Sequence, residues 1–127
     1  MILSILYISD STEKGRGVFT SADIPANTTI EIAPVIEFSK EDRKTIEQTK
    51  LYYYIFEWGK KKKKGALGLG YVSMYNHNYN ANCEYEMDYD ENTIAIKTIK
   101  KINAGEELFI NYNATPDDAS PVWFDAK

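Results

Sequence analysis

The sequence predicts a mainly β protein with one or two short helices. Short runs rich in Ile, Val, Tyr and Phe recur along the chain and are separated by Gly, Pro, Asn and Asp. One run, Cys83–Tyr89, alternates apolar or aromatic residues with acidic ones, which is the period of a half-buried strand. A helix-start pattern, a Ser followed three residues later by a carboxylate, stands out once, at Ser39-Lys40-Glu41-Asp42. Many short strands and little helix therefore define the fold class.

The expected elements follow in chain order. The predicted strands are Ile2–Ile8, Gly17–Thr20, Thr28–Phe38, Tyr52–Trp58, Ala66–Leu69, Cys83–Tyr89, Thr93–Ile99 and a last strand with Leu108, Ile110 and Tyr112 on one face. The best helix candidate runs from about Lys40 to Thr49. Pro34 lies inside a predicted strand, and because proline lacks a backbone donor it indicates an edge strand or a break. Turns are expected at Gly15–Gly17, Asp90–Asn92 and Asn103–Gly105.

Length and composition exclude several classes of protein. The 127 residues fit a single domain, 1–127, and a chain of this size buries enough surface to fold without a disulfide or a metal. One Cys and one His cannot build a Cys/His zinc site, so no metal is expected. A net charge of -4 disfavours nucleic-acid binding over the whole surface. No secretory signal or membrane-length apolar run is found, so an intracellular protein without a membrane association is expected.

The lysine run Lys60–Lys64 has two interpretations. The favoured one is a solvated hairpin tip between two strands. The other is an electrostatic contact with nucleic acid or an acidic partner, which would depend strongly on salt.

Three segments are candidates for chemistry. For Gly15-Arg16-Gly17 taken alone, a tight turn between strands is the favoured interpretation, and a backbone loop that approaches a ligand closely is the other. The segment from Tyr75 to Cys83 holds four Asn and the only His, which suit an irregular loop whose side chains bond to backbone or ligand. Gly105-Glu106-Glu107-Leu108 leads to Tyr112 at the end of the last predicted strand, where a tyrosine is usually part of the core.

These segments, in this order, resemble the SET-domain protein lysine methyltransferases. The family has a Gly-x-Gly near its start, an Asn-His segment that ends in Asn and often Cys, and a Gly-Glu-Glu-Leu strand that ends in Tyr. The resemblance covers nearly the whole chain. The chain departs from the pattern after Asn-His, where it has Asn78-Tyr79, and at Ala81 and Asn111, where the family usually has Pro and Asp. The cysteine-rich flanks of many relatives are absent, so the resemblance implies no zinc.

The resemblance implies a fold and a reaction. The fold is a set of small β-sheets with a knot-like core, in which the last strand passes beneath the Asn-His segment. The reaction moves a methyl group from S-adenosylmethionine to a lysine of a protein substrate, a histone or another basic protein, and leaves S-adenosylhomocysteine. The alternative is a catalytically inactive SET-fold binding module. A homodimer is also compatible with the resemblance.

The resemblance also assigns roles to residues. The cofactor-binding residues that it implies are Lys14, Gly15, Arg16, Gly17, Asn76, His77 and Trp123. Tyr112 matches the catalytic tyrosine, and Tyr85 matches a position that shapes the lysine pore and limits the number of methyl groups added. His77 is expected to serve the adenine through its backbone and to do no acid–base work. The core is expected to span about 1–112, and the tail 113–127, which carries Trp123, is expected to close the site.

Overall fold

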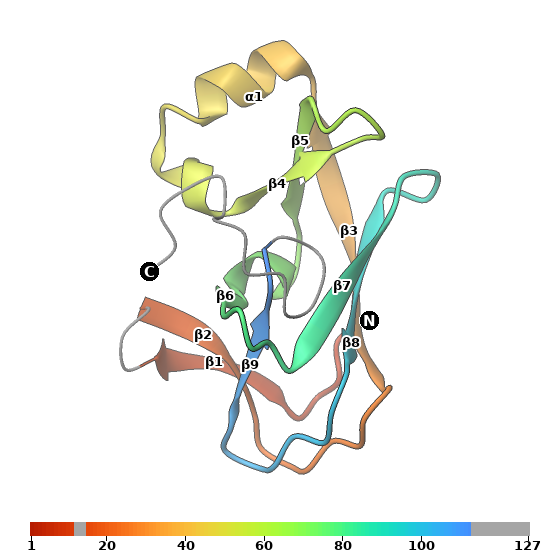
Figure 1. Cartoon of the computed structure of the whole chain (residues 1–127). Coiled ribbons are helices and arrows are strands. Elements are labelled where there is room, and N and C mark those ends of the chain that lie inside the picture. The colour runs from red at the N-terminus through yellow and green to blue at the C-terminus, as the bar shows by residue number, and fades with distance from the viewer. Residues whose placement is uncertain (12–14, 113–127) are drawn as a thin grey trace.

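The computed structural model describes residues 1–11 and 15–112, and most of their ordered elements are strands (Figure 1). The elements are β1 (Leu6–Ser11), β2 (Gly15–Thr20), β3 (Thr29–Phe38), α1 (Lys40–Ile46), the 3-10 helix η1 (Lys50–Tyr53), β4 (Ile55–Trp58), β5 (Lys64–Gly68), the 3-10 helix η2 (Val72–Met74), β6 (Asn76–His77), β7 (Cys83–Asp88), β8 (Thr93–Thr98) and β9 (Glu107–Ile110). The predicted β class with little helix is confirmed.

The strands form two sheets. One has four strands in the order β1-β2-β9-β6, and the other has five in the order β4-β5-β3-β8-β7. The β6–β9 pair is parallel, whereas all other pairs of neighbouring strands are antiparallel. Figure 1 shows α1 and the β4–β5 hairpin at one end of the molecule and β1, β2 and β9 toward the other. The last strand therefore lies between the strand of the glycine segment and the strand of the Asn-His segment, while the threaded crossing stays a prediction.

Of the two alternatives predicted for Pro34, an edge strand is wrong, because β3 lies inside the sheet, whereas the pairing of β3 does change at this residue. β3 pairs with β8 as far as Pro34 and with β5 from Val35 onward. On the β5 side, the N–H of Ile32 still donates to the carbonyl of Met1, and the carbonyl of Pro34 accepts from the N–H of Leu69. Pro34 thus stands where one partner ends and the next begins, and its missing donor interrupts no continuous ladder.

Two predicted strands begin later than expected because turns precede them. The N–H of Leu6 donates to the carbonyl of Leu3, so β1 begins only at Leu6. The hydroxyl of Thr49 accepts from the N–H of Leu51 at 3.2 Å and caps η1, so the tyrosines after it form a 3-10 turn before β4. Conversely, β2 already begins at Gly15, so the predicted Gly15–Gly17 turn is part of a strand.

The helix starts as predicted. The hydroxyl of Ser39 accepts from the N–H of Asp42 at 3.0 Å, which is the capping interaction that the sequence indicates. α1 ends at Ile46 rather than at Thr49, because hydrogen-bonded turns replace the helix over residues 47–49.

The core lies between the two sheets and fixes the register of the last strand. Leu108 and Ile110 are fully buried, as their alternation predicts, together with Val18 of β2 and Ile94 and Ile96 of β8. β9 ends at Ile110, so Tyr112 lies just beyond the strand. Among the described residues, no helix has the length and apolar character to cross a membrane.

Candidate active site

Three sequence-distant segments meet in the four-stranded sheet. β9 pairs with β2 at Val18↔Leu108, and with β6 at Asn76↔Phe109 and His77↔Ile110. The side chain of Asn76 then joins all three strands. Its Nδ2 donates to the carbonyl of Arg16 at 3.2 Å and to Oε2 of Glu107 at 2.8 Å. The structure thus brings together the glycine segment, the Asn-His segment and the last strand.

Gly17 allows this contact. A Cβ at Gly17 would lie 2.7 Å from Nδ2 of Asn76 and would overlap the carboxylate of Glu107. Contacts this short do not occur at real Cβ atoms, so only glycine lets Asn76 and Glu107 lie over β2. Gly15 is required for another reason, because its φ is +75°.

Tyr112 forms hydrogen bonds through its backbone N–H, its backbone carbonyl and its side-chain hydroxyl. Its hydroxyl donates to the carbonyl of Tyr75 at 2.8 Å, and its N–H donates to Nδ1 of His77 at 3.0 Å. Its carbonyl accepts from the hydroxyl of Tyr85 at 3.1 Å. The two tyrosines that the resemblance assigns to catalysis are therefore linked directly, and the residue beyond the strand end has a defined position.

Both phenols are neutral near neutral pH. Burial raises the pKa of Tyr112 above its usual 10, and the nearby Tyr54 and Glu107 act in the same direction. Burial also raises the pKa of Tyr85, with a smaller contribution from Glu57. Neither side chain can therefore serve as a phenolate base, although each can donate or accept a hydrogen bond.

Two pairs of aromatic rings lie at this site, one of which includes Tyr112. The ring centroids of His77 and Tyr112 are 5.0 Å apart, and those of Phe56 and Tyr85 are 5.4 Å apart. These rings come from β4, β6, β7 and the end of β9. Aromatic rings of this kind can pack against the aliphatic stem of a lysine side chain and interact favourably with its amine.

His77 uses its side chain to hold the backbone. The ring is buried, and Nδ1 accepts from Tyr112, which assigns the neutral tautomer with its proton on Nε2. This arrangement leaves Nδ1 engaged with the backbone, in line with the expectation that His77 does no acid–base work.

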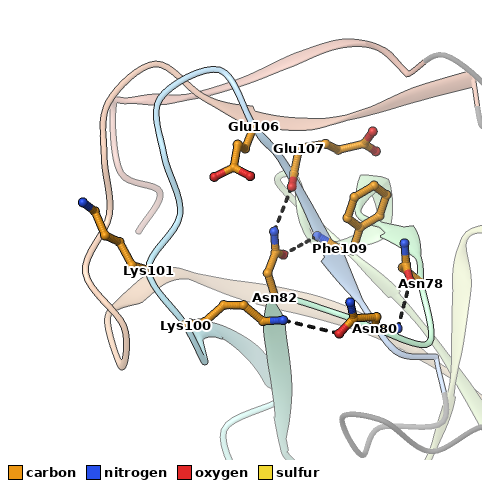
Figure 2. A pocket seen from close by; sticks show the side chains of 8 residues that line it. All are labelled: Asn78, Asn80, Asn82, Lys100, Lys101, Glu106, Glu107 and Phe109. Carbon is orange, nitrogen blue, oxygen red and sulfur yellow. Dashed lines mark hydrogen bonds between the residues drawn. The ribbon is translucent and has the colours of Figure 1, made fainter.

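A polar cavity is lined in part by Glu107 (Figure 2), the residue whose carboxylate accepts from Asn76. Its volume is about 460 Å³, within the range of small-molecule sites. It is lined by Asn78, Asn80, Asn82, Lys100, Lys101, Glu106, Glu107 and Phe109. The amide of Asn82 bonds to the backbone of β9 on both sides, donating to the carbonyl of Glu107 at 2.9 Å and accepting from the N–H of Phe109 at 2.8 Å.

None of the residues that line this cavity was assigned a role from the sequence. Glu107 connects the cavity to the predicted site because it binds Asn76. The asparagine run and Gly-Glu-Glu-Leu contain several of these residues and were noted in the sequence. The directions of their side chains, however, depend on the pairing of β6 with β9, which the sequence does not show. Lys14 and Trp123 lie outside the described residues. Within 1–11 and 15–112, no group of three His, Cys, Asp or Glu side chains could hold a metal ion.

Comparisons with known proteins agree with this arrangement. The SET domain family profile matches residues 15–113. A Schizosaccharomyces pombe histone-lysine N-methyltransferase, described as specific for lysine 37 of histone H3, is 41% identical over 126 residues, which are 98% of this chain and 80% of that protein.

Solved structures show the same fold. A Plasmodium falciparum protein described as a histone methyltransferase has a TM-score of 0.67 and 29% identity, over 87% of this chain and 95% of that one. Chaetomium thermophilum Polycomb Repressive Complex 2 bound to GSK126 has a TM-score of 0.70 and 24% identity, over 89% of this chain and 16% of the matched chain. Since the profile match covers most of the chain and the yeast relative nearly all of it, this protein belongs to the SET-domain family.

Proposed function

We propose that this chain is an S-adenosylmethionine-dependent protein-lysine N-methyltransferase with Tyr112 at the point of methyl transfer. Membership of the SET-domain family and the 41% identical histone-lysine methyltransferase support the lysine methyltransferase activity. The observation that carries the assignment of the site is the hydrogen-bonded Tyr112, which lies where β6, β7 and β9 meet. Since the relative acts on a histone, a histone is the first substrate to test, and an intracellular location is proposed with it.

The residues present fit the cofactor. Gly15, Arg16 and Gly17 would line its amino-acid end, and Gly17, which has no side chain, leaves room for Asn76 and Glu107 beside β2. Asn76 and His77 would bind its polar groups, and the 460 Å³ cavity offers room next to Glu107. Lys14 and Trp123 are proposed to complete the site. When bound, S-adenosylmethionine supplies a positively charged sulfonium whose S–CH3 bond breaks as the new N–CH3 bond forms.

The chain must make the substrate amine nucleophilic. A lysine amine has a pKa of about 10.4 in water, so it is mostly protonated at neutral pH. On this proposal the lysine side chain would lie against the rings of Phe56, Tyr85 and Tyr112, and the loss of water around its amine would disfavour the ammonium form and lower that pKa. Because both phenols are neutral and His77 Nδ1 is engaged, desolvation and alignment take the place of a dedicated base, and the proton leaves to solvent.

The hydroxyl of Tyr112 can act as an acceptor. Its proton is directed at the carbonyl of Tyr75, so toward a substrate amine the oxygen would accept a hydrogen bond rather than donate one. Tyr85 is bonded to the carbonyl of Tyr112, and its bulk narrows the same space. We propose that Tyr85 limits the number of methyl groups that one lysine receives.

Methyl transfer from labelled cofactor is the direct test. The protein is incubated with S-adenosyl-[methyl-³H]methionine and a panel of purified histones, and labelled lysines are located by mass spectrometry. We expect label on a histone lysine, and none with the Tyr112→Phe variant as a control.

The alternative, a SET-fold module that binds cofactor without catalysis, has a distinct outcome. It predicts cofactor binding in titration calorimetry but no labelled protein, either with histones or with a whole-cell lysate. That result would overturn the enzyme assignment.

A further inference from the structure

A buried carboxylate lies behind the candidate site. Glu31 of β3 is fully buried, and no ion pair among the described residues includes it. Its Oε2 accepts from the N–H of Tyr71 at 2.7 Å, and its Oε1 accepts from the hydroxyl of Tyr75 at 2.9 Å. Burial raises the pKa of Glu31, whereas the hydrogen bonds from Tyr71 and Tyr75 and the charge of the N-terminus favour the carboxylate, so these hydrogen bonds offset part of the cost of burying it.

Both hydrogen bonds fix the segment that enters the site. Tyr71 and Tyr75 flank η2, and Tyr75 immediately precedes β6. Gly70 completes the fit, because its φ is +100° and a Cβ there would lie 2.7 Å from Oε2 of Glu31. Glu31, which belongs to the five-stranded sheet, thus sets the conformation of the chain that leads into the four-stranded sheet.

Tyr75 carries this constraint to Tyr112. The ring of Tyr75 is 1% exposed and ends at Glu31, whereas its backbone carbonyl accepts the hydroxyl of Tyr112 at 2.8 Å. Two hydrogen bonds and one buried side chain therefore connect the carboxylate to the phenol. A displacement of about 1 Å at a reacting group can cost roughly a hundredfold in rate, so this connection matters if Tyr112 is catalytic.

We propose that Glu31 is a positioning residue that acts through Tyr75 and holds the carbonyl to which the Tyr112 hydroxyl donates. The proposal rests on the methyltransferase function proposed above. Glu31 and Tyr75 touch neither substrate nor cofactor in this scheme. Their loss should therefore reduce kcat and leave the KM values for cofactor and peptide within about twofold.

The first test is the Tyr75→Phe variant, which removes one hydroxyl and keeps the ring. Tyr71→Phe is the matched control, because Tyr71 binds Glu31 through its backbone N–H, which the substitution keeps. We expect Tyr75→Phe to lower kcat by roughly ten- to a hundredfold, and Tyr71→Phe to leave kcat unchanged. Circular dichroism and thermal unfolding establish that both variants are folded.

A double-mutant cycle separates positioning from general destabilisation. If Tyr75 acts through the Tyr112 hydroxyl, Tyr75→Phe should cause little further loss of rate in a Tyr112→Phe background. Glu31→Gln should reproduce part of the effect, because a Gln amide nitrogen cannot accept from the N–H of Tyr71. An unchanged kcat in Tyr75→Phe, or fully additive losses in the cycle, would overturn the proposal.

A spectroscopic readout keeps the test independent of turnover. With ¹³C-labelled tyrosine, the Cζ resonance of Tyr112 reports the hydrogen bond of its hydroxyl. We expect that resonance to shift in Tyr75→Phe and to stay in place in Tyr71→Phe, whether or not the protein methylates histones. An unshifted resonance rejects the positioning role alone, whereas absence of methyl transfer by the wild-type protein rejects the proposed function alone.

Discussion

Tyr112 combines a reactive position with an unusual number of fixed contacts. Its N–H, carbonyl and hydroxyl each have a partner from a different residue, namely His77, Tyr85 and Tyr75. Because the backbone contacts do not need the hydroxyl, Tyr112→Phe should keep the fold, with a loss of stability of about 1 kcal/mol. We expect methyl transfer to fall by roughly a hundredfold or more, measured with labelled cofactor alongside a thermal unfolding curve. Activity at the wild-type level in a folded variant would exclude Tyr112 from the chemistry.

Cys83 offers a residue-scale test of the core. Burial raises the pKa of its thiol from 9.0 to about 12. Since the folded pKa is raised, the resulting stability is present below pH 9 and is lost as the pH rises from about 9 to 12. At pH 8 we expect iodoacetamide to modify Cys83 only through unfolding, so intact mass should show slow labelling that urea accelerates. Complete labelling of the native protein within minutes would contradict the buried position.

Part of the candidate site could be proposed from the sequence through a family resemblance. Asn76, Tyr85, Tyr112 and the glycines were identified by their resemblance to a family pattern, and the structure brings them together. Glu31 had no signal, because a Glu in a strand is ordinarily exposed and its burial depends on the turn at Gly70. Its partner Tyr75 stands out in the sequence only as one aromatic of the asparagine-rich segment.

At the scale of elements, side chains from β6 and β9 pack so closely on β2 that they leave no room for a side chain at position 17. Gly17→Ala would place a Cβ against Asn76 and Glu107, which must then move. Because the ends of two flexible side chains can shift, we expect a loss of stability of only about 1 kcal/mol from the disturbed hydrogen bonds of Asn76, and weaker binding of S-adenosylmethionine in calorimetry because the Asn76 amide is displaced.

Gly105→Ala is the control for this prediction. Gly105 has a φ of +88°, and no atom lies within 4 Å of the place that a Cβ would take, so alanine adds backbone strain without crowding. The variant should lose about 1 kcal/mol of stability and keep its affinity for the cofactor. Equal affinities in the two variants would show that the packing at Gly17 does not position the binding residues.

Sequence patterns predicted an element correctly where interactions between residues close in the chain determine that element. The alternation of Cys83–Tyr89 predicted β7 because its two faces differ in polarity, and the Ser39 cap predicted the start of α1. The strand predicted at Tyr52–Trp58 begins only at Ile55, since aromatic residues favour strands but the Thr49 cap and the turn that follows it form η1 first. At Pro34 the pattern could not distinguish an edge strand from a break, because the change of partner strand there depends on tertiary pairing.

At the scale of the whole molecule, the site depends on pairing between segments far apart in the chain. The parallel β6–β9 pair joins Asn76 to Phe109, and β6, with two residues, is too short to be recognised as a strand by itself. Periodicity cannot predict which strand pairs with which, so the arrangement came from the family resemblance. The same pairing turns Glu107 toward Asn76 and creates the cavity.

The charge of the molecule is distributed unevenly. Lys60–Lys64 supply five of the fifteen basic side chains in a chain of net charge -4. Lys64 pairs with Glu37 at 3.2 Å, while no described carboxylate pairs with Lys60–Lys63, all of which are exposed. The guanidinium of Arg43 holds the loop by donating to the carbonyls of Lys62 and Lys64. The fold of this hairpin therefore uses the backbone of the run and leaves four ammonium groups in solvent.

We accordingly expect Lys60–Lys63 to be dispensable for stability and catalysis. Replacing all four with Gln should change the unfolding free energy by less than about 1 kcal/mol, because exposed charges contribute little, and should leave methylation of a histone peptide unchanged.

Fluorescence anisotropy with duplex DNA at low and at roughly physiological salt then decides between the two interpretations of the run. Equal, weak binding by the wild-type protein and the variant supports a solvated tip. Salt-dependent binding that the variant loses, and that Lys40→Gln with Lys44→Gln on α1 retains, would instead assign the run to nucleic-acid contact, because each released counterion steepens the salt dependence.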